Sequence, residues 1–230
     1  MTRLKICGLR DPDNALVAVE WGADFLGLNF MPGVRRQITP ERAREIVERV
    51  RAYSKGDAPR LVGLFADQPL DEVNDIVRRC GLDMAQLCGD EPPDYWARVE
   101  ADVIKQIKVR DDSLDDTLST VERVVQAGHV AMLDKYEKGA LGGTGRAFDW
   151  GIAQKVAERF SVVLAGGLTP DNVARAIVEV GPWGVDVSSG VETDGDKDPV
   201  KIRRFASEVK RADGREGKTP SSLRQAQDRL

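Results

Sequence analysis

The sequence contains very little histidine or cysteine, and this shortage excludes several classes of metal and redox protein. Its 230 residues include one histidine, His129, and three cysteines. A single imidazole cannot build a histidine-rich metal site, so we expect no metal. Three cysteines are too few for a disulfide framework and are typical of a protein from the reducing cytosol, and the absence of a Cys-x-x-Cys pair argues against a thiol redox protein.

Long hydrophobic runs and an excess of basic residues are missing as well. No apolar stretch approaches the ~18 residues that a membrane span needs, and Met1–Arg10 lacks the apolar segment of a signal peptide. Lys and Arg number 34 against 38 Asp and Glu, a net charge of −4, which is not the basic footprint of a nucleic-acid-binding protein. We therefore expect a cytoplasmic protein that binds neither membrane nor nucleic acid.

Short β-rich runs alternate with amphipathic helical stretches along the chain. The expected strands are Leu4–Ile6, Asp24–Leu28, Leu61–Phe65, Asp83–Leu87, Val103–Val109, His129–Leu133, Val162–Ala165 and Val185–Val187. The expected helices are Asp13–Glu20, Pro40–Arg51, Leu70–Arg79, Asp94–Glu100, Leu114–Gln126, Asp149–Glu158, Pro170–Val180 and Pro199–Lys210. Eight alternations favour an α/β fold, a single compact (β/α)8 TIM barrel, over a doubly wound sheet of five or six strands.

The barrel is expected to occupy residues 1–210 as one catalytic domain. Asp171 after Pro170, and Asp198 before Pro199, place capping and first-turn residues at two of the helix starts. Residues 211–230 have few apolar side chains among Gly, Lys, Ser, Gln and Arg. Such a segment has no face to bury, so we expect a disordered or loosely helical tail.

In a (β/α)8 enzyme the reacting groups lie where the strands end. Cys7 follows the first strand and Asp134 follows the sixth. A thiol of lowered pKa can accept a proton and a partly desolvated carboxyl can donate one. A small buried hydrophobe and a loop or capping residue are the structural alternatives for Cys7 and Asp134. His129 begins its strand at the opposite end of the barrel, which excludes a serine-triad hydrolase.

Lys5 shares the inward face of the first strand with Cys7, because side chains on one face recur every second residue. An unpaired charge inside a barrel is costly. Asp186, on the eighth strand, is the expected partner of this lysine.

Glycine-rich turns follow the seventh and eighth strands and indicate a phosphate site. The candidate residues are Gly166, Gly167, Ser188, Ser189 and Gly190. Glycine lets backbone N–H groups approach an anion, and these two loops commonly hold phosphate in such barrels. A third cluster, Gly142–Gly145, falls in the loop after the sixth strand. Tight turns also require glycine, but two clusters in consecutive loops favour phosphate binding.

Several distinctive motifs are spread over about residues 3 to 210. They are Lys5-Ile6-Cys7-Gly8-Leu9, Gly22-Ala23-Asp24, Gln86-Leu87-Cys88-Gly89-Asp90-Glu91, Leu133-Asp134, Gly142-Gly143-Thr144-Gly145, Phe148-Asp149-Trp150, Leu164-Ala165-Gly166-Gly167-Leu168, Asn172-Val173 and Val185-Asp186-Val187-Ser188-Ser189-Gly190-Val191-Glu192. Together they resemble the phosphoribosylanthranilate isomerases of tryptophan biosynthesis.

The resemblance implies an Amadori rearrangement of N-(5-phosphoribosyl)anthranilate to 1-(2-carboxyphenylamino)-1-deoxyribulose 5-phosphate, without metal or other cofactor. It implies that Cys7 is the general base, that Asp134 is the general acid and that Arg36 holds the anthranilate carboxylate. A planar guanidinium suits that bidentate contact, and the adjacent Arg35 is the competing candidate. The partner is then a phosphorylated small molecule, and the chain is expected to be a monomer or a homodimer.

The sequence departs from this resemblance at one position, and two alternative functions remain. The family usually has His where this chain has Cys88, which leaves open any role of that position in placing the substrate. Another phosphate-binding barrel enzyme would keep the glycine turns, but a metal-dependent epimerase needs absent histidines and an indole-glycerol-phosphate synthase needs lysine where Asp134 stands. A non-catalytic phosphoribosyl-binding barrel would have no reason to hold both Cys7 and Asp134.

Overall fold

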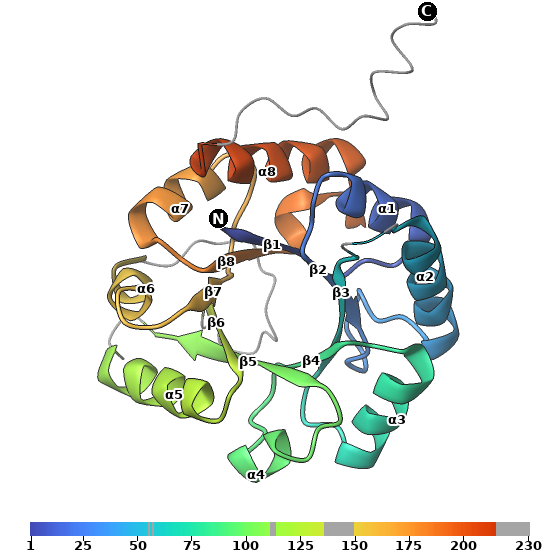
Figure 1. Cartoon of the computed structure of the whole chain (residues 1–230), viewed down its shortest axis with the longest axis horizontal. Coiled ribbons are helices and arrows are strands. Elements are labelled where there is room, and N and C mark those ends of the chain that lie inside the picture. Colours follow the sequence, from blue (N-terminus) through green and yellow to red (C-terminus); the bar gives the residue numbers. More distant parts are fainter. Residues whose placement is uncertain (55, 57, 111–113, 136–149, 215–230) are drawn as a thin grey trace, which may run out of the picture.

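Eight strands form the inner wall of the protein and helices surround them (Figure 1). The computed structural model describes residues 1–54, 56, 58–110, 114–135 and 150–214. In chain order the elements are β1 (Arg3–Ile6), α1 (Pro12–Glu20), β2 (Phe25–Asn29), α2 (Pro40–Tyr53), β3 (Arg60–Phe65), α3 (Leu70–Cys80), β4 (Met84–Leu87), α4 (Pro93–Trp96), β5 (Asp102–Val109), α5 (Leu114–Gln126), β6 (Val130–Lys135), α6 (Trp150–Ala157), β7 (Val162–Leu164), α7 (Val173–Val180), β8 (Gly184–Val187), the 3₁₀ turn η1 (Ser189–Val191), β9 (Glu192–Thr193), β10 (Asp196–Lys197) and α8 (Pro199–Ala212).

The strands are parallel and the sheet is closed. Each strand pairs with the next in sequence, and β1 also pairs with β8 in a register that sets Lys5 opposite Asp186. The first and last strands of the barrel therefore lie side by side. The expected fold, a (β/α)8 TIM barrel, is confirmed.

Side chains of each strand alternate between the barrel interior and the layer beneath the helices. The interior carries one apolar cluster, with Met84, Ile104, Met132 and Val163 among its members. The larger apolar cluster joins the outward side chains of the strands to the inner faces of the helices. Toward the carboxyl ends of the strands, polar side chains face the barrel interior. A polar site therefore lies above the apolar cluster.

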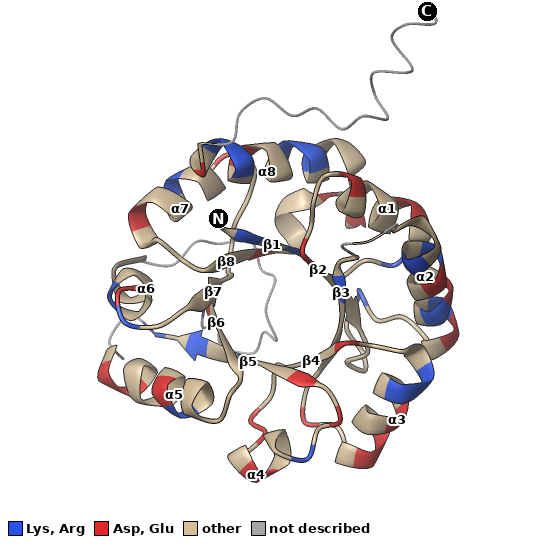
Figure 2. Cartoon of the chain, viewed as in Figure 1, with Lys and Arg blue, Asp and Glu red and all other residues tan. Residues whose placement is uncertain are grey.

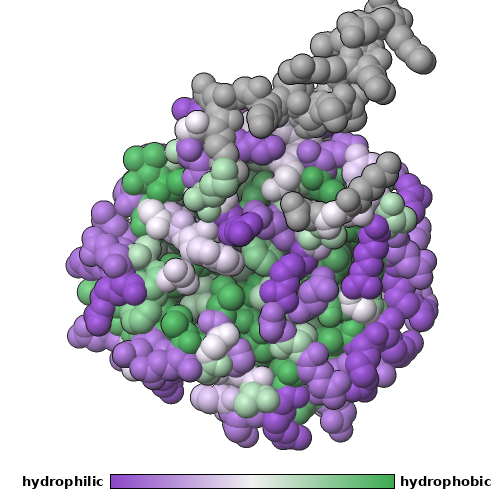
Figure 3. Space-filling model, viewed as in Figure 1, coloured by the Kyte–Doolittle hydropathy of each residue, from purple (hydrophilic) through white to green (hydrophobic). Residues whose placement is uncertain are grey.

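The outer surface is charged in a mixed pattern. Lys and Arg residues alternate with Asp and Glu around the ring of helices (Figure 2). In the space-filling view, hydrophilic side chains ring the molecule while hydrophobic atoms gather nearer its centre (Figure 3). Among the described residues, no helix combines the length and the apolar character needed to cross a membrane.

One expected helix is shorter in the structure because a side chain of the preceding helix forms hydrogen bonds with its backbone. The helix expected over Asp94–Glu100 ends at Trp96. Asn74 of α3 accepts a hydrogen bond from the backbone N–H of Glu100 (3.0 Å), and its Nδ2 donates to the carbonyl of Arg98 (3.1 Å), so this segment turns instead of continuing as a helix.

Helix α7 begins three residues later than the sequence predicts. The helix begins at Val173, because Asn172 Oδ1 accepts from the N–H of Thr169 (2.8 Å) and closes a turn before it. Asp171 therefore caps no helix, and its carboxylate instead contacts Arg204 of α8.

At the C-terminal end, α8 extends past the expected boundary at residue 210. It runs to Ala212, and Asp213 beyond it accepts hydrogen bonds from the N–H and the hydroxyl of Thr2, each at 2.8 Å. Most of the predicted tail, residues 215–230, lies outside the described residues, as does the Gly142–Gly145 cluster.

We expect the two aspartates proposed as helix caps to differ in their contribution to stability. Asp198 accepts hydrogen bonds from the N–H groups of Val200 and Lys201 and from the hydroxyl of Thr193. Asp198→Ala should lower the free energy of unfolding by about 1–2 kcal/mol. The matched Asp171→Ala removes only an exposed ion pair and should cost less than about 1 kcal/mol. Urea denaturation measures both, and equal losses would contradict the assignment of Asp198 as the cap.

Candidate active site

A small cavity opens at the carboxyl end of the barrel and collects the principal sequence candidates. Its volume is about 60 Å³, and it is lined by Cys7, Gly8, Asn29, Met31, Arg36, Leu64, Gln86, Cys88, Gln106, Asp134, Asp186 and Ser188. The proposed base, the proposed acid and the proposed carboxylate-binding arginine thus share one cavity. Among the described residues, no group of three or more His, Cys, Asp or Glu side chains is arranged to hold a metal ion.

A buried ion pair lies beneath the cavity, as the sequence predicted. Lys5 Nζ is 2.8 Å from Asp186 Oδ1, and the lysine side chain is 1% exposed. Burial by itself would lower the pKa of Lys5, but the adjacent Asp186 and Cys7 outweigh it and raise that pKa. Lys5 is therefore a permanently charged cation next to the thiol.

The environment of Cys7 shifts its pKa in the direction opposite to the one expected. The thiol is 5% exposed, and burial raises its pKa. The positive charges of Lys5 and Lys197 favour the thiolate but do not overcome the loss of solvation. The expectation of a lowered pKa is wrong for the free protein, because the same burial that brings Lys5 close also removes water from the sulfur.

Asp134 is a buried carboxyl at the other side of the cavity. It is 6% exposed and lies one residue before the end of β6 rather than beyond it. Its Oδ1 accepts from the backbone N–H of Lys135 (2.8 Å), and its Oδ2 accepts from Nε2 of Gln106. Burial raises the pKa of Asp134 to about 6, and the bond from Lys135 only partly opposes that rise. This carboxyl can hold a proton close to neutral pH.

Arg36 is the more buried of the two candidate arginines and is held by a carboxylate of its own chain. Its Nε and Nη2 donate to Oε1 and Oε2 of Glu192 at 2.6 and 2.9 Å. Burial opposes ionisation of Glu192, yet Arg36 and Lys197 hold its pKa at about 2. The arginine is thus fixed at the edge of the cavity that it lines, whereas Arg35, 56% exposed, pairs with the same carboxylate through Nη2.

Gly8 explains how this arginine reaches the cavity. The glycine has φ +73°, and a Cβ on it would lie 2.5 Å from Cδ of Arg36 and 3.2 Å from Oγ of Ser188. Any side chain here would displace the arginine, so the loop after β1 needs glycine for both its conformation and its packing.

The phosphate candidates lie beside the cavity and only one of them lines it. Ser188 lines it and donates from Oγ to the carbonyl of Cys7 (3.3 Å). Gly166, at φ +85°, packs so closely that a Cβ would lie 2.8 Å from Oδ1 of Asp134. A Cβ on Gly190 would lie 1.9 Å from the carbonyl oxygen of Leu168. The loops that carry Gly166–Gly167 and Ser188–Gly190 are therefore in direct contact.

Cys88 lies inside the barrel. It is 2% exposed, and Nε2 of Gln86 is 3.4 Å from its sulfur. Burial raises the pKa of Cys88 to about 12, so this thiol stays protonated. All three cysteines are free, as expected, and Cys7 and Cys88 form no disulfide.

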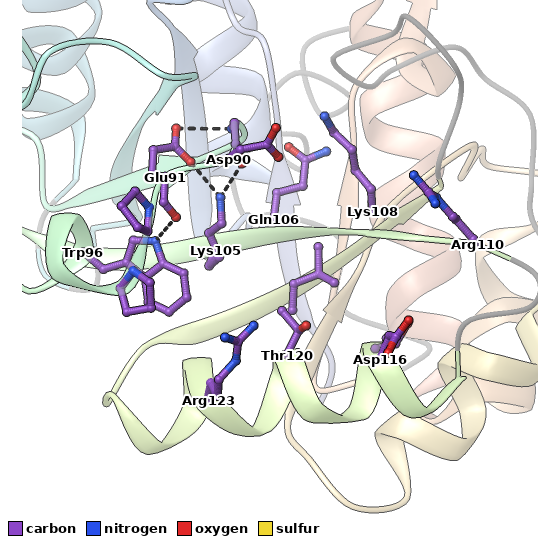
Figure 4. A pocket seen from close by; sticks show the side chains of 15 residues that line it. Asp90, Glu91, Trp96, Lys105, Gln106, Lys108, Arg110, Asp116, Thr120 and Arg123 are labelled. Carbon is purple, nitrogen blue, oxygen red and sulfur yellow. Dashed lines mark hydrogen bonds and ion pairs between the residues drawn. The ribbon is translucent and has the colours of Figure 1, made fainter.

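A larger cavity of about 680 Å³ lies between α4, β5 and α5 (Figure 4). Lys105 Nζ binds Oε2 of Glu91 (2.7 Å) and the carbonyl of Gly89 (2.6 Å), and Trp96 Nε1 donates to the carbonyl of Glu91 (2.7 Å). These contacts join β5 to the loop after β4. The lone histidine, His129, packs edge-on against Trp96 with 6.2 Å between ring centroids, in agreement with a structural role.

Sequence reasoning missed three residues of the site. Glu192 appeared only within a motif, and Lys197 and Gln106 were not singled out. Lys197 Nζ binds both Glu192 Oε1 and the carbonyl of Ser188, each at 2.8 Å. Period-two alternation along β5 could have placed Gln106 inside the barrel, but the β9–β10 hairpin that carries Glu192 and Lys197 follows no such pattern.

Comparison with known proteins identifies the family of this chain. The family model described as N-(5'phosphoribosyl)anthranilate (PRA) isomerase matches residues 4–208. The N-(5'-phosphoribosyl)anthranilate isomerase of Roseiflexus castenholzii is 47% identical over 213 residues, which are 91% of this chain and 98% of that protein.

Solved structures show the same fold. A phosphoribosyl anthranilate isomerase from Thermotoga maritima has a TM-score of 0.79 and 34% identity over 93% of this chain and all of that one. The dimeric isomerase of that organism has also been solved as monomers, with a TM-score of 0.75 and 33% identity. Another, in complex with reduced 1-(o-carboxyphenylamino)-1-deoxyribulose 5-phosphate, has a TM-score of 0.76 and 34% identity with the same coverage. With the family model matching most of its length, the chain belongs to the N-(5'-phosphoribosyl)anthranilate isomerase family.

Proposed function

We propose that this protein converts N-(5-phosphoribosyl)anthranilate to 1-(2-carboxyphenylamino)-1-deoxyribulose 5-phosphate, a step of L-tryptophan biosynthesis, with Cys7 as base and Asp134 as acid. The observation that carries the proposal is the shared cavity, in which a protonatable carboxyl and a thiol lie together with a fixed arginine. The ligand bound to a structural relative is a reduced form of this product. Neither a non-catalytic barrel nor a metal-dependent epimerase accounts for that set of groups.

The first step needs an acid, and Asp134 fits that role. The carboxyl donates its proton to the ring oxygen of the ribose as the C1′–O bond opens, and the nitrogen lone pair of the anthranilate forms an iminium ion. With a pKa of about 6, Asp134 retains its proton far better than an exposed aspartate and is still acidic enough to release it.

The second step needs a base, and Cys7 fits that role. Its thiolate removes the C2′ proton of the iminium ion, and the resulting enolamine takes a proton at C1′ and releases the proton of its C2′ hydroxyl as it relaxes to the ketose. Lys5 and Lys197 supply positive charge near the sulfur, and the iminium ion adds another when it forms. Because burial raises the pKa of Cys7, the thiolate is a minor species in the free protein.

In this proposal the reacting carbons occupy the small cavity, of about 60 Å³, and the two anionic ends of the substrate extend from it. Arg36 and Ser188, which line the cavity, lie where those two ends leave it. Arg36 binds the anthranilate carboxylate, while the loops with Gly166, Gly167, Ser188, Ser189 and Gly190 bind the phosphate. Holding both ends in this way can lower the barrier by several kcal/mol. No metal or cofactor enters the steps, and the choice between monomer and homodimer stays a prediction.

Substitution of the two reacting groups tests the function directly. With EDTA present, the purified protein should consume phosphoribosylanthranilate, measured as loss of its fluorescence. Cys7→Ser and Asp134→Asn should each lower kcat by about 10²–10⁴-fold with little change in KM, because each removes one proton transfer and leaves the anchoring groups intact. An inactive wild-type protein would refute the function. A Cys7→Ser variant with wild-type turnover would place the base elsewhere.

The pKa directions predict an unusual pH dependence. The reactive form has Asp134 protonated and Cys7 ionised, although the pKa of the acid, about 6, lies below the raised pKa of the thiol. Between these two values each unit rise in pH lowers the fraction of protonated Asp134 and raises the fraction of thiolate by the same factor, so kcat/KM should be nearly constant. Below about pH 6 only the thiolate fraction still changes, and kcat/KM should fall tenfold for each unit of decreasing pH. The measurement uses substrate well below KM, because kcat/KM reports the pKa values of the free protein. A steady rise from pH 6 to 8 would contradict this assignment.

The two arginines that share Glu192 provide a matched pair. Arg36→Ala should raise KM about 10- to 100-fold with kcat nearly unchanged, because it removes a charge-assisted contact made before and during the reaction. Glu192 keeps Lys197 and Arg35 as partners in that variant. Arg35→Ala should change KM less than about twofold, since the side chain is mostly exposed. Equal effects on KM would show that the anthranilate carboxylate does not bind at Arg36.

A further inference from the structure

Gln106 contacts the proposed acid, and no step described above uses it. The residue belongs to β5, is 6% exposed, and donates from Nε2 to Oδ2 of Asp134 on β6. It lines the same cavity as Cys7 and Asp134. Figure 4 shows its side chain projecting from β5 away from α5, together with Lys108. Gln106 is thus the only side chain among the described residues with a hydrogen bond to this carboxylate.

The carbonyl oxygen of the same amide has no hydrogen-bond partner in the part of the chain that the structure describes. Among the described residues, Oε1 of Gln106 is fully buried and accepts no hydrogen bond. Burying an unsatisfied carbonyl is unfavourable, so a residue kept solely for packing would be replaced by an apolar side chain without loss. The contact that distinguishes glutamine from such a side chain is the bond to Asp134.

An amide is also well matched to a carboxyl that gains and loses a proton. Its N–H₂ group donates to an ionised carboxylate, and its carbonyl, after rotation of the amide by a half turn, accepts from the protonated acid. A lysine here would hold Asp134 in its ionised form, and a glutamate would compete with it for the proton. Glutamine supports both protonation states.

We propose that Gln106 is a positioning residue for the acid step, which orients the Asp134 carboxyl toward the substrate through both its ionised and its protonated states. The proposal rests on the proposed function, since it requires Asp134 to donate the proton. Lys135 fixes Oδ1 through its backbone N–H (2.8 Å) and Gln106 fixes Oδ2, so the plane of the carboxyl is held at both oxygens. The charged groups that act on this carboxyl are Asp186 of β8 and Lys108 of β5.

Gln106→Met tests the proposal, because methionine has similar length and cannot donate a hydrogen bond. Loss of the donor disfavours the carboxylate, so the titration midpoint of Asp134 should rise by about one pH unit. The measurement is the ¹³C signal of the Asp134 carboxyl, identified by its absence in Asp134→Asn. At pH 5 the acid is protonated in both proteins, and there kcat should fall about tenfold with KM within about twofold, because the carboxyl is no longer oriented.

Gln106→Glu is the second variant, for use if the methionine variant fails to fold. It keeps the shape of the side chain but adds a carboxyl that shares a proton with Asp134. The midpoint of Asp134 should then rise further than in Gln106→Met.

The control is Gln68→Met. Gln68 is also 6% exposed, also donates to a carboxylate (Glu72, 2.8 Å) and also has a buried Oε1 without a partner among the described residues, but it does not line the cavity. Its substitution should leave both the titration of Asp134 and kcat unchanged. The comparison separates the loss of any buried amide from the loss of the Gln106–Asp134 hydrogen bond.

The outcomes separate this proposal from the function on which it rests. If the wild-type protein is inactive, the proposed function fails, and if Asp134→Asn turns over normally, the assignment of Asp134 as the acid fails. If both of those results support the function, yet folded Gln106→Met has wild-type kcat at pH 5 and an unchanged midpoint, Gln106 serves only packing and the present proposal is overturned.

Discussion

The ion pair between Lys5 and Asp186 joins the first and last strands of the barrel, and the rest of the site lies above this pair. The two residues lie opposite each other in the register of β1 and β8, and the lysine is almost completely buried. Removal of one partner from such a pair typically costs about 3–5 kcal/mol, because it leaves the other charge buried and unpaired. The ion pair between these two neighbouring strands therefore also holds a fixed positive charge beside Cys7.

A second group of ion pairs, centred on Glu192, lies closer to the surface. Glu192 belongs to the β9–β10 hairpin and accepts hydrogen bonds from Arg36, in the loop after β2, and from Lys197 of its own hairpin. Lys197 also binds the carbonyl of Ser188. One carboxylate thus positions an arginine and, through Lys197, the loop after β8. The groups assigned to the two ends of the substrate are consequently held by a single network.

Much of the fold could be predicted from local sequence patterns, because a parallel barrel repeats one unit of a strand, a helix and their turns. The Lys5–Asp186 pair could be predicted because alternate side chains of a strand face the barrel interior, and a charge buried there needs a partner of opposite sign. What could not be predicted depended on contacts between distant segments. Asn74 shortens α4 by binding the backbone of Arg98 and Glu100, and nothing in the local sequence of Asp94–Glu100 records that contact. The direction of the Cys7 pKa failed for the same reason, since it depends on how much water the folded barrel excludes.

Gly166 has a consequence for how this barrel can be altered. The βα loops of such folds are commonly treated as exchangeable parts carried by a constant frame. Here the space that a Cβ would need at Gly166 is occupied by the Asp134 carboxylate and the backbone N–H of Lys135. The end of β6 and the turn after β7 therefore form one steric unit. A loop graft after β7 that replaces this glycine also moves the acid on β6, so new substrate specificity must be built on both segments at once.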